Sequence, residues 1–304
     1  MTEGNTRYEQ ACRFLPNKWQ AFAKQLPRPE WERVEEIRLR VGQPVTVLLP
    51  DGEHLITEDL RYTVTSDELE QLCDLVCGYS RYAVSRTLAQ GYLTAAGGFR
   101  VGLCGTVVMS EEKNTNLRDI SSAVIRIGRA KEGIAEPLSE KLLENGRFPG
   151  TLVISPPGGG KTTLLRDMIR CLSDGTGGYP ACRVALADER GEVAGMYHSE
   201  PQFYVGRHTD ILDGCPKAAA AEILVRAMNP QVIAMDEITA DRDLTAMKAA
   251  ANCGVVLLAT IHGENMEELK RKPLFRKMLK AQVFRKAVLI HHAEECRRYE
   301  VIDL

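Results

Sequence analysis

Three glycines followed by a lysine and two threonines, at residues 158–163, have the clearest chemistry in the sequence. Glycines allow backbone N–H groups to approach the oxygens of a phosphate without a side chain in the way. An apolar stretch, 151–154, precedes them and a helical pattern, 163–171, follows. The start of that helix would point its positive end at the anion. The pattern predicts a loop that binds the phosphates of ATP.

The residue types within this loop predict separate roles. Lys161 would reach the β- and γ-phosphates, and the Thr162 hydroxyl would ligate Mg²⁺. The consensus spacing requires a glycine at position 155, where this chain has Ser155; that position leaves the strand and tolerates a serine. A fortuitous glycine-rich turn is the alternative, but it leaves the flanking strand and helix patterns unexplained. The predicted nucleotide-binding residues are Pro157, Gly158, Gly159, Gly160, Lys161, Thr162 and Thr163.

Two carboxylates directly follow a second apolar stretch, 232–235. A strand buried on both faces would deliver Asp236 to the carboxyl edge of a sheet, where it can hold the Mg²⁺ shell. Glu237 would then polarise a water for in-line attack on the γ-phosphate. A strand end that caps a neighbouring helix is the alternative, and the phosphate loop upstream favours catalysis.

Two further apolar stretches also end in polar residues. The stretch 184–187 precedes Asp188 and Glu189, and the stretch 255–259 precedes Thr260 and His262. Polar residues from four strands at one sheet edge make a stronger indication of a site than any single motif. We expect His262 to sense the γ-phosphate or to orient the water, with a purely structural histidine as the alternative.

Composition limits the classes of protein to consider. The 304 residues exceed the usual size of one core, so two domains are expected. The net charge of −2 excludes a whole-molecule field that would attract nucleic acid or anionic lipid. Nine scattered cysteines indicate free thiols in a reducing compartment. The longest apolar run, 255–261, is too short to span a bilayer, so we expect a cytoplasmic protein.

The order of the patterns predicts two domains with a boundary near residue 135. Residues 1–134 mix helix and strand signals, including a capping box at Thr65 and Glu68 and a hairpin hinged at Gly97 and Gly98. The stretch 130–150 reads as a helical connector. From 151 onwards, short buried strands alternate with helices, which indicates an α/β domain (135–304) with a mostly parallel sheet.

The constellation resembles the RecA-like ATPases of type II and type IV secretion and of pilus assembly. In that family an acidic "Asp box", matched here by Asp188 and Glu189, and a "His box", matched by His262, complete the ATP site. The resemblance implies a RecA-like fold, ATP and Mg²⁺ as cofactors, a catalytic contribution from Glu189 and a homo-hexamer. Many of these motors have glycine where this chain has Asp236, and many carry a four-cysteine zinc module that it lacks.

The sequence resembles more closely still a secretion-ATPase-like family of endospore-forming bacteria. That resemblance implies a cytoplasmic ATPase, peripheral at a membrane-embedded channel complex on the mother-cell side. The matching stretches cover nearly the whole chain: 36–40, 97–102, 155–158, 162–167, 188–190 and 235–237.

The same resemblance implies an arginine from the amino-terminal domain of a neighbouring subunit. Positive charge is needed where charge builds on the oxygens of the transferring phosphoryl group. The candidates are Arg100, after the glycine hinge, and Arg126, in the strand before the connector. An ordinary surface role is the alternative for both.

Other functions stay open on the sequence alone. A small-molecule phosphotransferase would not need the water-activating Glu237. A nucleic-acid-dependent RecA-like ATPase is the stronger rival, because lysines and arginines crowd residues 270–286; the same stretch could contact a membrane surface. A scaffold that holds ATP without hydrolysing it is the third alternative. We expect a hexameric motor that acts on membrane-embedded channel or secretion proteins, and no nucleic-acid partner.

Overall fold

The computed structural model describes residues 6–78, 85–110, 113–292 and 297–304. The chain divides into two compact units, each described here by itself. The first contains the residues up to Arg129 together with Gly195–Gln202, and the second contains Ala130–Ala194 and Phe203–Leu304. The domain boundary between residues 134 and 135 stays a prediction.

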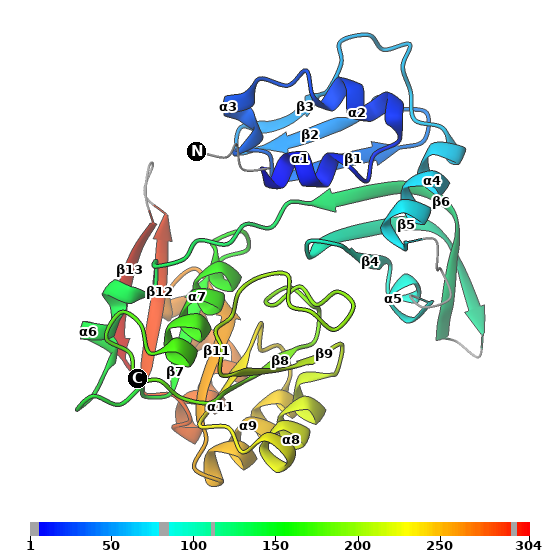
Figure 1. Cartoon of the computed structure of the whole chain (residues 1–304). Coiled ribbons are helices and arrows are strands. Elements are labelled where there is room, and N and C mark those ends of the chain that lie inside the picture. The colour runs from blue at the N-terminus through cyan, green and yellow to red at the C-terminus, as the bar shows by residue number, and fades with distance from the viewer. Residues whose placement is uncertain (1–5, 79–84, 111–112, 293–296) are drawn as a thin grey trace. The chain divides into compact units, whose positions relative to one another are not determined.

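The first unit is built on a six-stranded antiparallel sheet with the strand order β3-β2-β1-β6-β5-β4 (Figure 1). The predicted hairpin hinged at Gly97 and Gly98 is present as β4 and β5, whose Ala95 and Phe99 pair across that turn. The strands are β1 (Glu36–Arg40), β2 (Thr46–Leu49), β3 (Gly52–Leu55), β4 (Tyr92–Ala95), β5 (Phe99–Ser110) and β6 (Lys113–Arg126). The helices are α1 (Arg7–Cys12), α2 (Asn17–Ala23), α3 (Arg28–Trp31), α4 (Ser66–Val76) and α5 (Ser85–Ala89).

The core of the first unit joins these helices to the sheet. Trp19 of α2 and Leu69 of α4 are fully buried in one apolar cluster with Ile37 of β1. The predicted capping box begins α4: Thr65 Oγ1 accepts from the backbone N–H of Glu68, and the Glu68 carboxylate accepts from that of Thr65. The helix thus satisfies two of its terminal N–H groups and buries its apolar face.

The second unit contains a seven-stranded sheet with the order β13-β12-β7-β11-β10-β8-β9. All neighbouring strands run parallel except β12 and β13, which form an antiparallel hairpin. The four strands predicted from apolar stretches are present as β7, β8, β10 and β11. The strands are β7 (Thr151–Ser155), β8 (Val184–Asp188), β9 (Thr209–Asp213), β10 (Val232–Met235), β11 (Val256–His262), β12 (Lys286–His292) and β13 (Arg297–Asp303).

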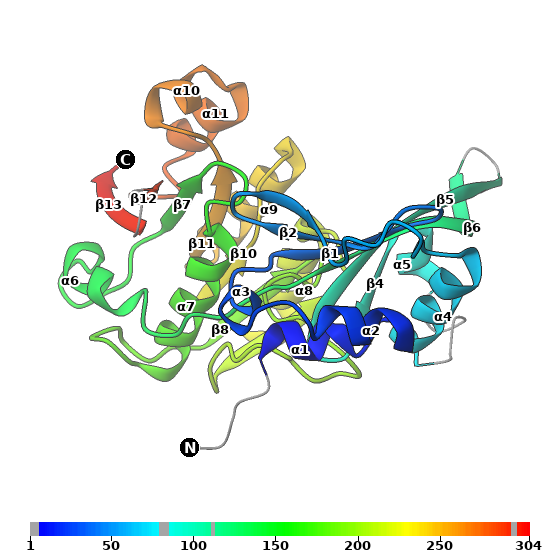
Figure 2. The ribbon, with the colours of Figure 1, turned by 90° about the horizontal axis from the view of Figure 1, so that it is seen from above.

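Helices cover both faces of this sheet (Figures 1 and 2). Residues of α8, α9, α10 and α11 pack with one face in a buried apolar cluster that contains no residue of α7. Helix α7 follows the phosphate loop and lies over the other face. The helices are α6 (Ser139–Leu142), α7 (Lys161–Asp174), α8 (Lys217–Met228), α9 (Asp241–Asn252), α10 (Met266–Arg271) and α11 (Pro273–Ala281).

The connector is less helical than the sequence predicts. Between residues 130 and 150 only one 3₁₀ turn, Glu136–Leu138, and the short α6 form. Two buried side chains of α7 hold the segment instead. Asp167 accepts hydrogen bonds from the backbone N–H groups of Gly133 and Ala135, and Arg170 pairs with Asp167 at 2.6 Å and with Glu136 at 2.9 Å.

The basic stretch 270–286 forms part of this packed unit. Phe275 and Met278 of α11 are buried. Several of its charges have acidic partners: Lys272 with Glu268, Lys277 with Asp241, and Arg285 and Lys286 with Glu144. Among the described residues, no helix is long and apolar enough to cross a membrane, and the described cysteines are free.

Candidate active site

The predicted phosphate loop lies between β7 and α7. Gly158 has a φ of +73° and Gly160 a φ of +90°, so both occupy the left-handed region that favours glycine. Gly160 precedes the first residue of α7, and the free N–H groups of that helix end face the loop. Ser155 ends β7 without a positive φ and its hydroxyl donates to Pro156 O at 3.1 Å. A serine therefore fits where the consensus has glycine.

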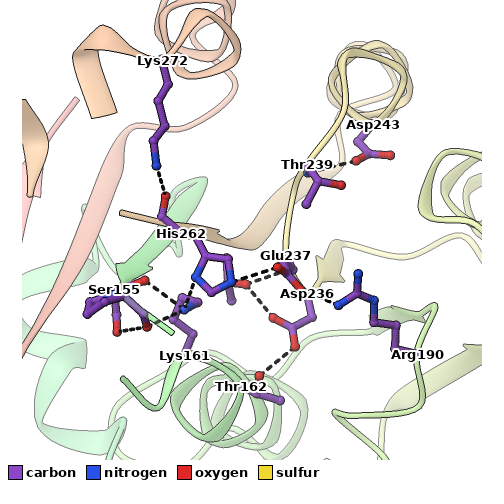
Figure 3. Close-up of polar contacts among 12 residues, drawn as sticks. Ser155, Lys161, Thr162, Arg190, Asp236, Glu237, Thr239, Asp243, His262 and Lys272 are labelled. Atoms are coloured by element: carbon purple, nitrogen blue, oxygen red, sulfur yellow. Dashed lines mark hydrogen bonds and ion pairs between the residues drawn. The ribbon is translucent and has the colours of Figure 1, made fainter. Parts of the chain in front are cut away.

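Lys161 is buried and bonded within the loop. Its Nζ donates to the carbonyl oxygens of Ser155 and Pro156, each at 2.9 Å, and lies 2.9 Å from Nδ1 of His262 (Figure 3). Burial lowers the pKa of Lys161, while the nearby charges of Asp236 and Glu237 act in the opposite direction. A buried ammonium at the start of a helix favours an anion as its next partner.

Thr162 and Asp236, the two residues predicted to ligate Mg²⁺, are in direct contact. The Thr162 hydroxyl donates to Asp236 Oδ2 at 2.8 Å across the end of the sheet. Hydroxyl and carboxylate oxygens suit Mg²⁺, which takes few protein ligands and keeps waters and phosphate oxygens in its shell. The described residues contain no cluster of three or more His, Cys, Asp or Glu arranged to hold a metal by themselves. Thr162 and Asp236 supply two oxygen atoms of the kind that Mg²⁺ prefers as ligands.

Glu237 has a φ of +53°, in the left-handed region that residues other than glycine rarely adopt. Three contacts fix this conformation. Its backbone N–H donates to Thr260 Oγ1 at 2.8 Å, and its carboxylate contacts His262 Nε2 and Arg190 Nη1, each at 2.9 Å. The turn points Glu237 back towards the phosphate loop, as Figure 3 shows.

His262 connects Lys161 of the loop with Glu237, which follows β10. The ammonium of Lys161 can only donate, so His262 Nδ1 accepts and its proton lies on Nε2, which donates to the Glu237 carboxylate. The register of the sheet explains the position, because His262 pairs with Ser155 of β7. Strand β11 therefore places His262 beside the phosphate loop.

The two acidic residues after β8 face different partners. Asp188 is buried and accepts hydrogen bonds from the backbone N–H groups of Glu192, Val193 and Ala194. Burial raises the pKa of Asp188 to about 6, although these hydrogen bonds oppose the shift. Glu189 pairs with the buried Lys217 at 2.5 Å. Both acids line a small cavity with Asp236 and Glu237.

Arg100 and Arg126 lie opposite each other on β5 and β6 in the first unit. The Arg100 guanidinium stacks on the Tyr92 ring at 4.1 Å, and Arg126 pairs with Glu36 at 3.3 Å. Pro157 is exposed and Thr163 half-buried at the first turn of α7.

Sequence reasoning did not assign roles to Thr260, Arg190 or Lys217. The Thr260 hydroxyl donates to Asp236 Oδ1 at 2.6 Å while it accepts from Glu237, so it links both carboxylate residues. Its position two residues before His262 was a usable signal, since alternate strand residues face the same side of a sheet. Arg190 and Lys217 reach the acids through loop and helix geometry, which no local pattern predicts.

The sheet order and the site define the class of the fold. The chain has the RecA-like α/β fold of the secretion ATPases. It is similar to the ATPase DotB of Yersinia pseudotuberculosis (TM-score 0.61, 15% identity, 95% of this chain and 80% of that one). It is also similar to the pilus retraction motor PilT (TM-score 0.58, 16% identity, 91% and 81%). At these identities the likeness concerns the fold alone.

The family follows from the sequence comparisons. The model of the family "Sporulation stage III, protein AA" matches residues 6–302. The chain is 36% identical over 270 residues to the stage III sporulation protein AA of Bacillus subtilis (strain 168), a match that covers 89% of this chain and 86% of that protein. The chain therefore belongs to the stage III sporulation protein AA family.

Proposed function

We propose that this chain is a Mg²⁺-dependent ATPase that hydrolyses ATP to ADP and phosphate and powers a membrane-embedded export or channel complex during endospore formation. The residues 157–163 bind the nucleotide, Thr162 and Asp236 hold the metal, and Lys161, Glu237 and His262 act on the γ-phosphate and the attacking water. Glu189 supports this site from the end of β8.

One observation carries the proposal: a continuous set of polar contacts joins the loop to the ends of two strands. Lys161 contacts His262, His262 contacts Glu237, Glu237 binds Thr260 through its backbone, and Thr260 and Thr162 both bind Asp236. A phosphate loop, a metal-ligand pair and a carboxylate for water activation thus meet at one edge of the sheet, where ligands bind in open α/β sheets.

The chemistry follows from these positions. Glu237 takes a proton from the attacking water as the water oxygen bonds to the γ-phosphorus and the bond to the bridging oxygen of ADP breaks. That proton then leaves Glu237 for the released phosphate or for solvent. Mg²⁺, when bound, neutralises charge on the phosphate oxygens. Lys161 exchanges its carbonyl contacts for phosphate oxygens. His262 holds the Glu237 carboxylate in the orientation required by the water.

The assembly is part of the same proposal. Family membership and the secretion-ATPase fold support a cytoplasmic homo-hexamer that docks on a membrane complex on the mother-cell side. Residues 1–134 serve assembly and docking, and residues 135–304 form the catalytic domain. In a ring closed by head-to-tail interfaces, one surface of each subunit meets a different surface of the next subunit. Arg100 or Arg126 of one subunit thus contacts the nucleotide bound by its neighbour.

The test is ATP hydrolysis measured across a range of protein concentrations. For a site completed by a neighbouring subunit, activity per subunit rises with protein concentration. Lys161→Ala abolishes the activity, and Glu237→Gln binds ATP without cleaving it. Activity per subunit that stays constant to high dilution contradicts the intersubunit site. Wild-type protein that binds no ATP at any concentration contradicts the ATPase itself.

Mixing inactive variants identifies the arginine that acts in trans. Lys161→Ala is mixed with Arg100→Ala or with Arg126→Ala and the subunits are allowed to exchange. An equimolar mixture regains activity at about a quarter of the interfaces, those that combine an intact loop with an intact arginine. An arginine variant that regains no activity on mixing acts within its own subunit or outside the site.

A further inference from the structure

The carboxy-terminal hairpin brings an arginine to the phosphate loop within the same compact unit. Strand β12 lies between β7 and β13, and its Leu289 pairs with Ile154 of β7. The end of β12 therefore lies at the same edge of the sheet as the phosphate loop. Strand β13 begins at this edge, because Arg297 pairs with His292.

The Arg297 guanidinium lies directly against Gly160 of the loop. A Cβ atom at residue 160 would be 2.7 Å from both Cζ and Nη1 of Arg297, so the side chain uses the space left by the glycine. Tyr299 lies two residues further along β13, on the same face of the strand, and its pKa depends on the charges of Arg297 and of Asp167. Burial raises its pKa, Arg297 lowers it and Asp167 of α7 raises it. Arg297 is thus on the α7 side of the hairpin.

The charge at this position is the opposite of what a helix start favours. Gly160 is the residue before α7, a helix of 14 residues with no side-chain cap, and its amino end carries partial positive charge. Lys161 adds an ammonium at the first helical position. In the ranges 6–78, 85–110, 113–292 and 297–304, no carboxylate is ion-paired with Arg297. Two cations and a helix start around one loop form a field suited to a polyanion.

We propose that Arg297 is a further phosphate contact in the nucleotide site, supplied by the same subunit that supplies Lys161. The inference rests on the proposed ATPase function. It adds to the site one positive charge that comes from the nucleotide-binding subunit itself and not from its neighbour. A guanidinium can bind two phosphate oxygens through parallel N–H groups, which a lysine cannot do. The ligand class is the phosphate chain of a nucleoside triphosphate.

The experiment compares binding of Mg-ATP and of inorganic tripolyphosphate by isothermal titration calorimetry. The Glu237→Gln background prevents turnover, and Arg297→Gln and Arg297→Lys are added to it. Arg298→Gln is the matched control, because Arg298 is also exposed, is the next residue, and faces the other side of the strand. Arg297→Gln is expected to weaken both ligands about tenfold, the size of one lost charged hydrogen bond. Arg297→Lys recovers part of this loss, and Arg298→Gln leaves both affinities unchanged.

The outcomes separate this inference from the proposed function. If the parent Glu237→Gln protein with Arg297 intact binds neither ligand, the ATPase proposal itself fails. If the parent binds ATP and Arg297→Gln binds it as tightly as Arg298→Gln does, Arg297 is not a phosphate contact. A loss for ATP with no loss for tripolyphosphate assigns Arg297 to the base or ribose and also overturns the inference. Thermal unfolding of each variant establishes that it is folded.

Discussion

The hydroxyl of Thr260 donates a 2.6 Å hydrogen bond to Oδ1 of Asp236, across neighbouring parallel strands. The Thr260 hydroxyl oxygen also accepts a hydrogen bond from the backbone N–H of Glu237. Thr260 is fully buried, and its hydroxyl is therefore committed to these two partners. A single side chain thus fixes both the carboxylate proposed to ligate the metal and the turn that carries the proposed catalytic Glu237.

Replacing Thr260 with valine tests this arrangement. The substitution keeps the shape but leaves the Glu237 N–H and one Asp236 oxygen without that partner, which costs about 1–3 kcal/mol of unfolding free energy. ATP turnover is expected to fall more than ATP affinity, because Lys161 and the loop are untouched. Urea unfolding and steady-state kinetics measure the two effects. Thr245→Val, on an exposed face of α9, is the control and changes neither.

The sequence predicted which polar residues stand at the ends of the strands, but not the order of the strands in the sheet. Asp236, Glu237 and His262 follow apolar stretches whose identity as strands is local, and each is present at the predicted strand end. The placement of β11 between β7 and β10 depends on long-range pairing. That placement brings His262 to Ser155 and Thr260 to Asp236, and no pattern within either strand contains this information.

The misses have physical reasons. The connector contains good helix formers, but Gly133, Pro137 and Gly146 interrupt them, and contacts with Asp167 and Arg170 hold its backbone outside a long helix. The hairpin of β12 and β13 was not predicted, because the sequence before it was interpreted by its high content of lysine and arginine and not by its apolar residues. Arg297 consequently received no role, although it lies against the loop that the sequence predicted best.

A pH effect on stability is expected from Asp188. Burial raises its pKa to about 6, above that of the unfolded chain, so the folded protein binds the extra proton at acidic pH. This contribution to unfolding free energy is present at low pH, decreases as the pH rises through about 6, and is lost above it. Asp188→Asn removes the titrating group. The wild type's stability advantage over the variant is therefore expected to be larger by about 1–2 kcal/mol near pH 5 than near pH 7.5.

Urea unfolding of both proteins at the two pH values measures this difference. Asp210→Asn, on the neighbouring strand β9, controls for the loss of a carboxylate elsewhere in the sheet. An advantage that is equal or greater at the higher pH would mean that Asp188 stays ionised. The hydrogen bonds from the backbone N–H groups of Val193 and Ala194 would then outweigh its burial.

The two contacts of His262 are separable by substitution. Glutamine retains a donor near Nε2 for Glu237 and loses the acceptor for Lys161, whereas asparagine retains an acceptor near Nδ1 and loses the donor for Glu237. We expect His262→Gln mainly to weaken ATP binding and His262→Asn mainly to lower the turnover number. Alanine lowers turnover by about 10- to 100-fold, as for a lost charged hydrogen bond. Separate kcat and KM measurements are required, and identical effects of glutamine and asparagine would contradict the two roles.

The contact between Gly160 and Arg297 predicts non-additive effects of substitution. Gly158→Ala and Gly160→Ala both place a side chain at positive φ and are expected to cost about 1–2 kcal/mol of unfolding free energy. Only the new methyl group at 160 displaces the Arg297 guanidinium; a Cβ at 158 meets nothing within 4 Å. In ATP titrations, Gly160→Ala combined with Arg297→Gln is therefore expected to bind about as weakly as Gly160→Ala alone. The effects of Gly158→Ala and Arg297→Gln add, as for independent sites. If the effects add equally in both pairs, the Arg297 guanidinium does not contact the phosphate loop in solution.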